Sequence, residues 1–209
     1  MEVVVGLFPV VPSRTALVNV DLQNFFVESA AEGPAILGRV NELAAACRAA
    51  GVLVVHTAHV LRPDGSNVGV LGELIPAVRD EGFLYEGSRD AALHADLVVD
   101  PLDVYVAKPR FGGFHDTELE HILRDRGIDT IAITGISTDV CCDTTAREAN
   151  ARDFRVLFVG DATAVNAVEA DVAIAQRQAV LELLDGLFAE VVTSDEFLDR
   201  LQGATTAQP

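Results

Sequence analysis

Short apolar runs alternate with helical stretches along the chain, and this alternation constrains the fold more than any other feature. Six runs are expected to be strands, at 15–21, 52–58, 103–108, 129–135, 155–161 and 189–194. The first, second, fourth and fifth runs are almost continuously apolar, which is typical of parallel strands buried on both faces. Helical patterns fall between them at about 35–50, 117–127, 139–151 and 168–187, and a short helix follows the last run. The sequence therefore predicts an α/β fold, a three-layer αβα arrangement around a six-stranded, mostly parallel, doubly wound (Rossmann-like) sheet.

The length of the chain suits one domain with a sizeable core, since it has 209 residues. We expect a single domain over 1–209, with an N-terminal arm at 1–13 and a flexible tail at 203–209. Residues 61–102 are turn-rich and weakly periodic, so we expect loops that cover one end of the sheet and shape a pocket there.

Composition narrows the class of partner. The net charge is −17 at pH 7, which argues against binding to nucleic acid or to anionic membranes and leaves a small molecule as the expected partner. No run approaches the length of a membrane span. The N-terminal apolar run lacks a preceding basic region and contains Pro9 and Pro12, so it does not resemble a signal peptide. Three cysteines give no disulfide framework, and a reducing cytoplasmic setting is expected.

Polar residues follow several predicted strands, at the sheet edge where open α/β folds bind ligands. Each alone has an ordinary explanation, because an aspartate can cap a helix, a lysine can be a surface charge and a cysteine can be a small core residue. Their shared placement predicts a crevice with a carboxylate, an ammonium and a thiol. The residues concerned are Asp21, His56, His59, Lys108, Cys141 and Asp161.

The adjacent cysteines Cys141 and Cys142 are expected to have different roles. Ser137, Thr138 and Asp139 are all good helix N-caps, so Cys141 falls in the first helical turn, where a thiolate is favoured. Cys142 lies about 100° further round the helix, so we expect it to pack in the core. With the positive charge of Lys108 nearby as well, we expect the pKa of Cys141 to lie below the free-cysteine value of about 8.5.

Three motifs carry a resemblance to a known family: "ALVNVDLQNFF" (16–26), "KPRFGGF" (108–114) and "GISTDVCCDTTAREA" (135–149). Over roughly residues 14–195 the chain resembles the isochorismatase-like cysteine hydrolases, and in pattern it is most similar to carbamoyl-sarcosine and ureidoacrylate-type amidohydrolases. The resemblance implies that Asp21, Lys108 and Cys141 correspond to the catalytic triad. It also implies a homo-oligomer, a dimer or tetramer, which the apolar N-terminal arm independently favours.

The resemblance implies a mechanism as well. Asp21 would accept the Cys141 proton, the thiolate would attack an amide or ureido carbonyl, and Lys108 would stabilise the negative charge. A thioester acyl-enzyme would follow, with the backbone N–H groups of Ser137 and Cys141 as oxyanion donors. In relatives the Ile136–Ser137 peptide bond would be cis.

The chain also departs from the family patterns. Gly112 replaces a frequent serine, and the D-x-H-x5-H pattern of metal-binding relatives is missing, so we expect no metal and no other cofactor. His59 aligns with a substrate-contacting glutamine of isochorismatases. True isochorismatases commonly lack the cysteine, so its presence favours cleavage of a C–N bond.

Two alternatives remain open. One is vinyl-ether hydrolysis of the isochorismatase type, with Asp21 as the acid. The other is a non-enzymatic redox or ligand-binding protein that uses its thiol directly. The residues expected to bind substrate are His59, Phe26, Phe111 and His115.

Overall fold

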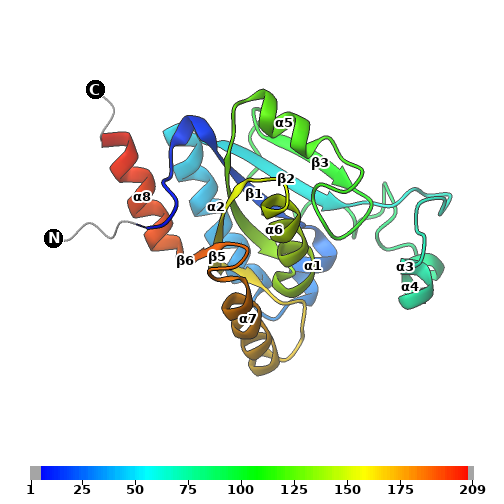
Figure 1. The fold of residues 1–209 in the computed structure, drawn as a ribbon. Coiled ribbons are helices and arrows are strands. Elements are labelled where there is room, and N and C mark those ends of the chain that lie inside the picture. Colours follow the sequence, from blue (N-terminus) through cyan, green and yellow to red (C-terminus); the bar gives the residue numbers. More distant parts are fainter. Residues whose placement is uncertain (1–5, 207–209) are drawn as a thin grey trace.

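The centre of the fold is a six-stranded sheet in the computed structural model, which describes residues 6–206 (Figure 1). The strand order is β3-β2-β1-β4-β5-β6, and every neighbouring pair is parallel. The α/β prediction is confirmed, and the sheet is entirely rather than mostly parallel. The strands are β1 (Thr15–Val20), β2 (Leu53–His59), β3 (Val104–Lys108), β4 (Thr130–Ile136), β5 (Arg155–Ala164) and β6 (Glu190–Val192).

The helices follow the expected alternation with several differences. Short helical segments at 12–14 and 24–29 were not predicted, and the predicted helix at 139–151 is divided into a π-helical turn and an α-helix. The loop segment contains two short helices, and the last helix extends through Thr206, into the expected tail. The helices are α1 (Asn24–Ser29), α2 (Gly33–Ala50), α3 (Leu71–Leu74), α4 (Pro76–Asp80), α5 (Leu119–Asp125), α6 (Asp143–Asn150), α7 (Ala170–Leu184) and α8 (Ser194–Thr206), with a 3₁₀ turn η1 (Pro12–Arg14) and the π-helical turn η2 (Thr138–Cys142).

Both faces of the sheet are buried, which explains why its central strands are apolar without alternation. On one face, Val18 of β1 packs in a cluster with Leu119 of α5. On the other face, the preceding residue of β1, Leu17, packs with Leu43 of α2 and Phe197 of α8. Figure 1 shows α2 and α8 on one side of the sheet and α5 and α6 on the other.

The strand order reverses between β1 and β4, because the chain builds β2 and β3 on one side of β1 and the later strands on the other. Ligands of doubly wound sheets bind at this point, outside the carboxyl ends of the strands. The two strands approach closely there. Gly135 has φ 117°, and a Cβ atom at this position would lie 2.0 Å from the carbonyl oxygen of Val20. Only glycine therefore fits at the end of β4.

The described part of the N-terminal arm packs on its own chain. The backbone N–H groups of Leu7 and Phe8 donate to the Glu190 carboxylate at 3.0 and 2.8 Å, and Glu190 also pairs with Arg200 of α8. Val10 is buried against the same region. Residues 1–5 of the arm lie outside the described range. Of the apolar residues in 6–13, Val10 is buried on its own chain and Leu7 is 71% exposed.

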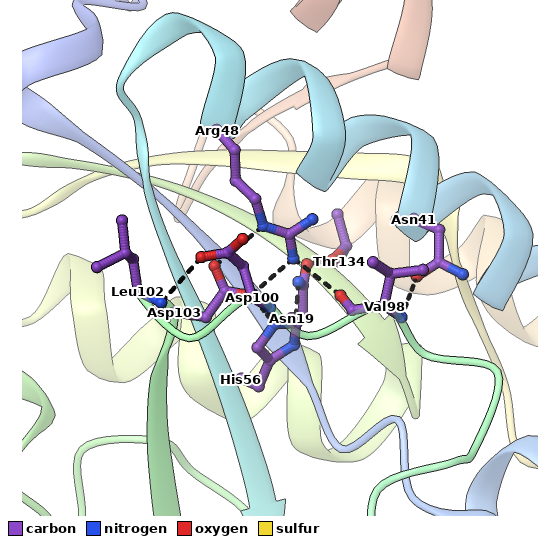
Figure 2. A network of polar contacts seen from close by, with 9 residues as sticks. All are labelled: Asn19, Asn41, Arg48, His56, Val98, Asp100, Leu102, Asp103 and Thr134. Atoms are coloured by element: carbon purple, nitrogen blue, oxygen red, sulfur yellow. Dashed lines mark hydrogen bonds and ion pairs between the residues drawn. The ribbon is translucent and has the colours of Figure 1, made fainter.

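One residue expected at the crevice, His56, lies instead in a buried polar network near the middle of the sheet (Figure 2). Its Nε2 is 3.0 Å from Asp103 Oδ2, and Arg48 of α2 pairs with the same carboxylate at 2.6 Å. On the other side of the ring, Asn19 Nδ2 lies 3.3 Å from Nδ1, and Thr134 donates to Asn19 at 2.7 Å. Because His56 and His59 are three residues apart in one strand, their side chains point to opposite faces.

Candidate active site

Three residues that the sequence placed at strand ends meet at the reversal of strand order. Asp21 follows β1, Lys108 is the last residue of β3, and Cys141 lies in η2 after β4. Lys108 Nζ is 2.7 Å from Asp21 Oδ2. Asp21 and Lys108 have no exposed surface, and Cys141 is 2% exposed. The three side chains therefore form a closed group in which charges are screened little by water.

Asp21 is held in one orientation by Thr57 of β2. The Asp21 N–H donates to the Thr57 carbonyl oxygen at 3.1 Å, and the Thr57 hydroxyl donates to Asp21 Oδ1 at 2.9 Å. The backbone of Asp21 has φ 51°, a left-handed conformation that few non-glycine residues adopt. Among the described residues, Oδ2 faces Lys108 without a hydrogen bond of normal geometry. Oδ2 is thus the oxygen available to take a proton.

Lys108 is the only lysine in the chain. Besides the Asp21 carboxylate, its Nζ donates to the carbonyl oxygens of Arg110 and Phe111 at 3.0 and 2.8 Å. Burial alone would lower the pKa of Lys108, but the charge of Asp21 outweighs it and the pKa is raised. One ion pair and two hydrogen bonds therefore hold the ammonium, and its role toward the other two residues is that of a fixed positive charge.

The pKa of Cys141 differs from the sequence-based expectation. Burial raises it to about 12, and the charge of Asp21 and a hydrogen bond to that residue act in the same direction. Lys108 and the backbone N–H of Ser137 act in the opposite direction and are outweighed. The prediction of a lowered pKa was wrong because it counted the nearby positive charges and omitted the cost of desolvating a thiolate. The resting thiol is neutral at neutral pH.

The neighbouring cysteine faces the core, as the sequence predicted. Cys142 has no exposed surface, and its Sγ lies 3.8 Å from the carbonyl oxygen of Thr134. Both cysteines lie in the turn η2, which is π-helical, a form often found at functional sites. None of the expected cap residues caps it through a side chain. Instead the Ser137 carbonyl oxygen accepts hydrogen bonds from Val140 and Cys142, and the Ile136–Ser137 peptide bond is cis.

A cavity of about 290 Å³ opens onto Cys141, close to the lower limit of about 300 Å³ for ordinary ligand pockets. Segment 61–102 contributes much of its wall through α3, α4 and the loop after them, as expected. The apolar lining consists of Phe25, Phe26, Leu71, Ile75, Val78, Phe83, Leu84, Phe111 and Val140. The polar lining consists of His59, Ser137, Asp139, Cys141 and Asn166. A larger hollow of about 430 Å³ lies by the amino-terminal ends of the strands and contains no cysteine.

His59 is a buried polar group whose ring contacts the backbone of Pro109 without a well-formed hydrogen bond. Among the described residues, neither ring nitrogen has a hydrogen bond of normal geometry. Burial, followed by the charge of Lys108, lowers its pKa to about 4, so the imidazole is neutral. The ring meets Phe111 edge to face at 5.8 Å between centroids. A neutral imidazole offers one donor and one acceptor to whatever occupies the cavity.

Gln23 positions His59, and sequence reasoning assigned it no role. Its side chain accepts from the His59 N–H at 2.7 Å and donates to the His59 carbonyl oxygen at 3.0 Å and to that of Ala91 at 2.7 Å. Gln23 thus joins the ends of β1 and β2 to the loop segment. The signal for it was already in the motif "DLQ" (21–23).

Two further residues that the sequence placed at the crevice lie away from the cavity. The His115 side chain is 54% exposed, lies 3.5 Å from Asp116, and does not line the cavity. Asp161 does not end β5, which continues to Ala164. Its Oδ1 accepts from the backbone N–H and the hydroxyl of Ser194 at 2.7 and 2.8 Å, so it binds the start of α8.

The Gly112 departure from the family pattern has a structural counterpart. A Cβ atom at Gly112 would lie 2.2 Å from Glu148 Oε2, and the same oxygen accepts from the Phe114 N–H at 2.9 Å. The Glu148 carboxylate therefore occupies the space that a serine side chain would need. Gly112 itself does not line the cavity.

Residues 6–206 contain no group of three or more His, Cys, Asp or Glu side chains that is placed to hold a metal ion. Within the same range, no helix is long and apolar enough to cross a membrane. The expectation that the protein needs no metal stays a prediction.

A doubly wound sheet with a thiol, a carboxylate and an ammonium at its switch point defines an α/β enzyme with a small, closed site. The isochorismatase domain model matches residues 15–196. The chain therefore belongs to the isochorismatase family of hydrolases.

Individual relatives agree with this assignment. A ureidoacrylate amidohydrolase RutB of Methylorubrum extorquens is 33% identical over 172 residues, which cover 71% of this chain and 69% of the relative. The isochorismatase of Bacillus subtilis (strain 168) is 31% identical over 197 residues, covering 92% of this chain and 60% of the relative. The crystal structure of a cysteine hydrolase from Pseudomonas syringae pv. phaseolicola 1448A has a TM-score of 0.89 and 32% identity, covering 98% of this chain and all of that one (100%).

Proposed function

We propose that the protein is a cysteine hydrolase that cleaves a C–N bond of a small amide or ureido (carbamoyl) substrate through a thioester acyl-enzyme. The observation that carries the proposal is the buried thiol of Cys141 beside the Asp21–Lys108 ion pair, in the wall of a small cavity. The similarity to RutB and to the Pseudomonas cysteine hydrolase supports the same bond type and the same nucleophile.

The first half-reaction forms the thioester. Because the resting thiol is neutral, its proton moves to Asp21 Oδ2 as Sγ attacks the substrate carbonyl carbon. Lys108 keeps the Asp21 oxygens negative until that transfer. The backbone N–H groups of Ser137 and Cys141, both of which line the cavity, are the proposed donors to the oxyanion. Protonated Asp21 then gives its proton to the departing nitrogen, and ammonia or an amine leaves as the C–N bond breaks, which completes the thioester.

The second half-reaction returns the enzyme to its starting state. Asp21 then takes a proton from water, whose oxygen attacks the thioester carbonyl. The C–S bond breaks, the product leaves as a carboxylic or carbamic acid, and Cys141 recovers its proton.

Substrate contacts are proposed from the cavity wall. His59 is the main candidate because both ring nitrogens are buried and neither makes a hydrogen bond of normal geometry among the described residues. An amide N–H or carbonyl oxygen of the substrate would satisfy one of them, which removes the cost of an unmade hydrogen bond. Phe26 and Phe111 line the same cavity and would contact the apolar part of the substrate.

The second candidate function is vinyl-ether hydrolysis with Asp21 as the acid. It is favoured by the similarity to the Bacillus isochorismatase and needs no thiol. A direct redox role for the thiol is less well supported, because Cys142 faces the core and all three cysteines are free and buried.

The test separates the two adjacent thiols. Cys141→Ala and Cys142→Ala proteins are assayed for ammonia release from a panel of small amides and ureides, with circular dichroism to verify folding. We expect Cys141→Ala to lose activity by at least about 1000-fold and Cys142→Ala to keep at least a tenth of it, the order of loss found for other nucleophiles. Comparable losses in two folded variants would contradict the assignment of the nucleophile.

We also propose a homo-oligomer, a dimer or tetramer, in the cytoplasm. Helix α7 supports the oligomer, because Val172, Ile174 and Leu183 are 43%, 48% and 54% exposed on it. A cytoplasmic location is supported by the three free cysteines, since a nucleophilic thiol must stay reduced. Light scattering at micromolar concentration tests the oligomer, and a stable monomer would contradict it.

A further inference from the structure

We propose that the cavity beside Cys141 takes an uncharged amide or ureide with an apolar substituent, and that Asp139 makes it reject substrates that carry a carboxylate. This inference rests on the proposed function and specifies its substrate class. RutB relatives are named for an acrylate, which carries a carboxylate, so this chain would differ from them in the charge that it accepts.

The charge of the cavity wall is the first argument. Among the described residues that line the cavity there is no arginine and no lysine, and Asp139 is the only acidic side chain. His59 is the remaining titratable group besides Cys141, and it is neutral at neutral pH. A substrate carboxylate would therefore leave water without meeting a cation, and it would share a small cavity with another carboxylate.

Neighbouring cations cannot replace the missing one. Lys108 is paired with Asp21 at 2.7 Å and donates to two backbone carbonyl oxygens. Arg110, close by in sequence, donates through Nη1 to the carbonyl oxygens of Asn67 and Pro109 at 2.7 and 2.6 Å. Neither side chain lines the cavity. A bidentate arginine clamp of the kind that binds carboxylates is thus missing from the described wall.

Asp139 lies where it can act on the substrate. It is two residues before Cys141 in η2, and its Oδ1 accepts a short hydrogen bond from the Ser137 hydroxyl. The same hydroxyl accepts from the Asn166 N–H at 3.0 Å, which fixes its direction. The carboxylate is therefore held at the wall beside the nucleophile, and it offers acceptors to the N–H groups of an amide or ureide.

The rest of the wall favours an apolar substituent. Phe25 and Phe83 stack with their ring centroids 4.5 Å apart, and Phe26 meets Phe25 edge to face at 5.1 Å. Leu71 and Val78 of the short helices α3 and α4 complete this side. Burying an apolar group against these side chains is favourable, whereas a charged group would lose its hydration there.

The experiment compares two substrates of nearly equal shape, 4-methylbenzamide and 4-carboxybenzamide. Ammonia release gives kcat/KM for each with the wild-type protein, Asp139→Asn, and the control Asp116→Asn. Asp116 is 79% exposed and outside the cavity, so its variant removes one negative charge without changing the wall. Thermal shift of the folded Cys141→Ala protein with each amide measures binding without turnover.

We expect the wild-type protein to prefer the methyl compound by at least about 100-fold in kcat/KM, because only the carboxylate must leave water without meeting a cation. Asp139→Asn should reduce this ratio at least tenfold, and Asp116→Asn should leave it unchanged. The Cys141→Ala protein should be stabilised by the methyl compound alone. A further variant, Asp139→Ser, repeats the comparison if Asp139→Asn does not fold.

Three results would overturn the inference. One is wild-type turnover of the two amides within threefold, which leaves the proposed function standing. A second is a ratio that Asp139→Asn does not change. The third is stabilisation of Cys141→Ala protein by the carboxylate as strong as that by the methyl compound. Turnover of a vinyl ether with no amide turned over would instead contradict the proposed function.

Discussion

Replacing Lys108 with methionine removes the only positive charge from a fully buried group and leaves the Asp21 carboxylate without its ion-pair partner. Breaking a buried pair in this way costs about 3–5 kcal/mol of stability. Two backbone carbonyl oxygens also lose a donor, so we place the loss toward the upper end of that range. Urea unfolding followed by circular dichroism measures the change.

A double variant separates the ion pair from simple loss of packing. In Lys108→Met with Asp21→Asn, neither charge remains, so the free energy of unfolding should exceed the additive expectation by about 1–3 kcal/mol. The matched control is Arg39→Met, which removes an ion pair at the surface. In that pair Arg39 Nη1 lies 3.6 Å from Asp161 Oδ2, and the arginine side chain is 44% exposed. That control should cost less than about 1 kcal/mol.

Activity should fall in Lys108→Met by at least about 100-fold in kcat/KM, because an unpaired buried Asp21 holds a proton and cannot accept another. The double variant should be as inactive as Lys108→Met, even where it is more stable. Since Lys108 is the only lysine, lysine-selective isotope labelling gives one side-chain NMR signal, which should titrate above the ordinary value of about 10.4. Additive stability losses, or a Lys108 signal that titrates below that value, would refute the reasoning.

Three further predictions follow from the site and the fold. Because burial raises the pKa of Cys141 to about 12, alkylation of its peptide by iodoacetamide should increase with pH through about pH 10 without a plateau, and a plateau below about pH 9 would contradict the assignment. Dialysis against a chelator should leave activity unchanged, and loss restored by zinc, manganese or iron would show a metal requirement. Gly135→Ala should destabilise the protein by about 2–6 kcal/mol in urea unfolding, from strain and overpacking against the Val20 backbone, whereas Gly203→Ala should change stability by less than about 1 kcal/mol.

The prediction of site residues from the ends of strands was correct where the position of a residue follows from the sheet topology alone. Asp21 and Cys141 follow their strands and Lys108 ends its own, so the topology of a parallel sheet brings all three to one edge. It failed for His56 and Asp161. The alternation of side chains turns His56 toward Asp103, and β5 continues beyond Asp161 to Ala164.

Other features depend on contacts between segments far apart in the sequence. The sign of the Cys141 pKa shift depends on how completely the folded protein buries the thiol, which no local pattern reveals. The exposure of the His115 side chain to solvent depends on the conformation of the turn that contains it. The aromatic wall pairs Phe25 with Phe83, two residues that only the folded loop segment brings together.

The measurement that tests the central claim most directly is intact-protein mass spectrometry after rapid acid quench of the wild-type enzyme with an amide that it turns over. The account predicts a mass increment equal to the acyl group of the substrate, mapping to Cys141 and missing from Cys141→Ala. Full turnover without any covalent species, with Cys141→Ala as active as the wild type, would contradict it.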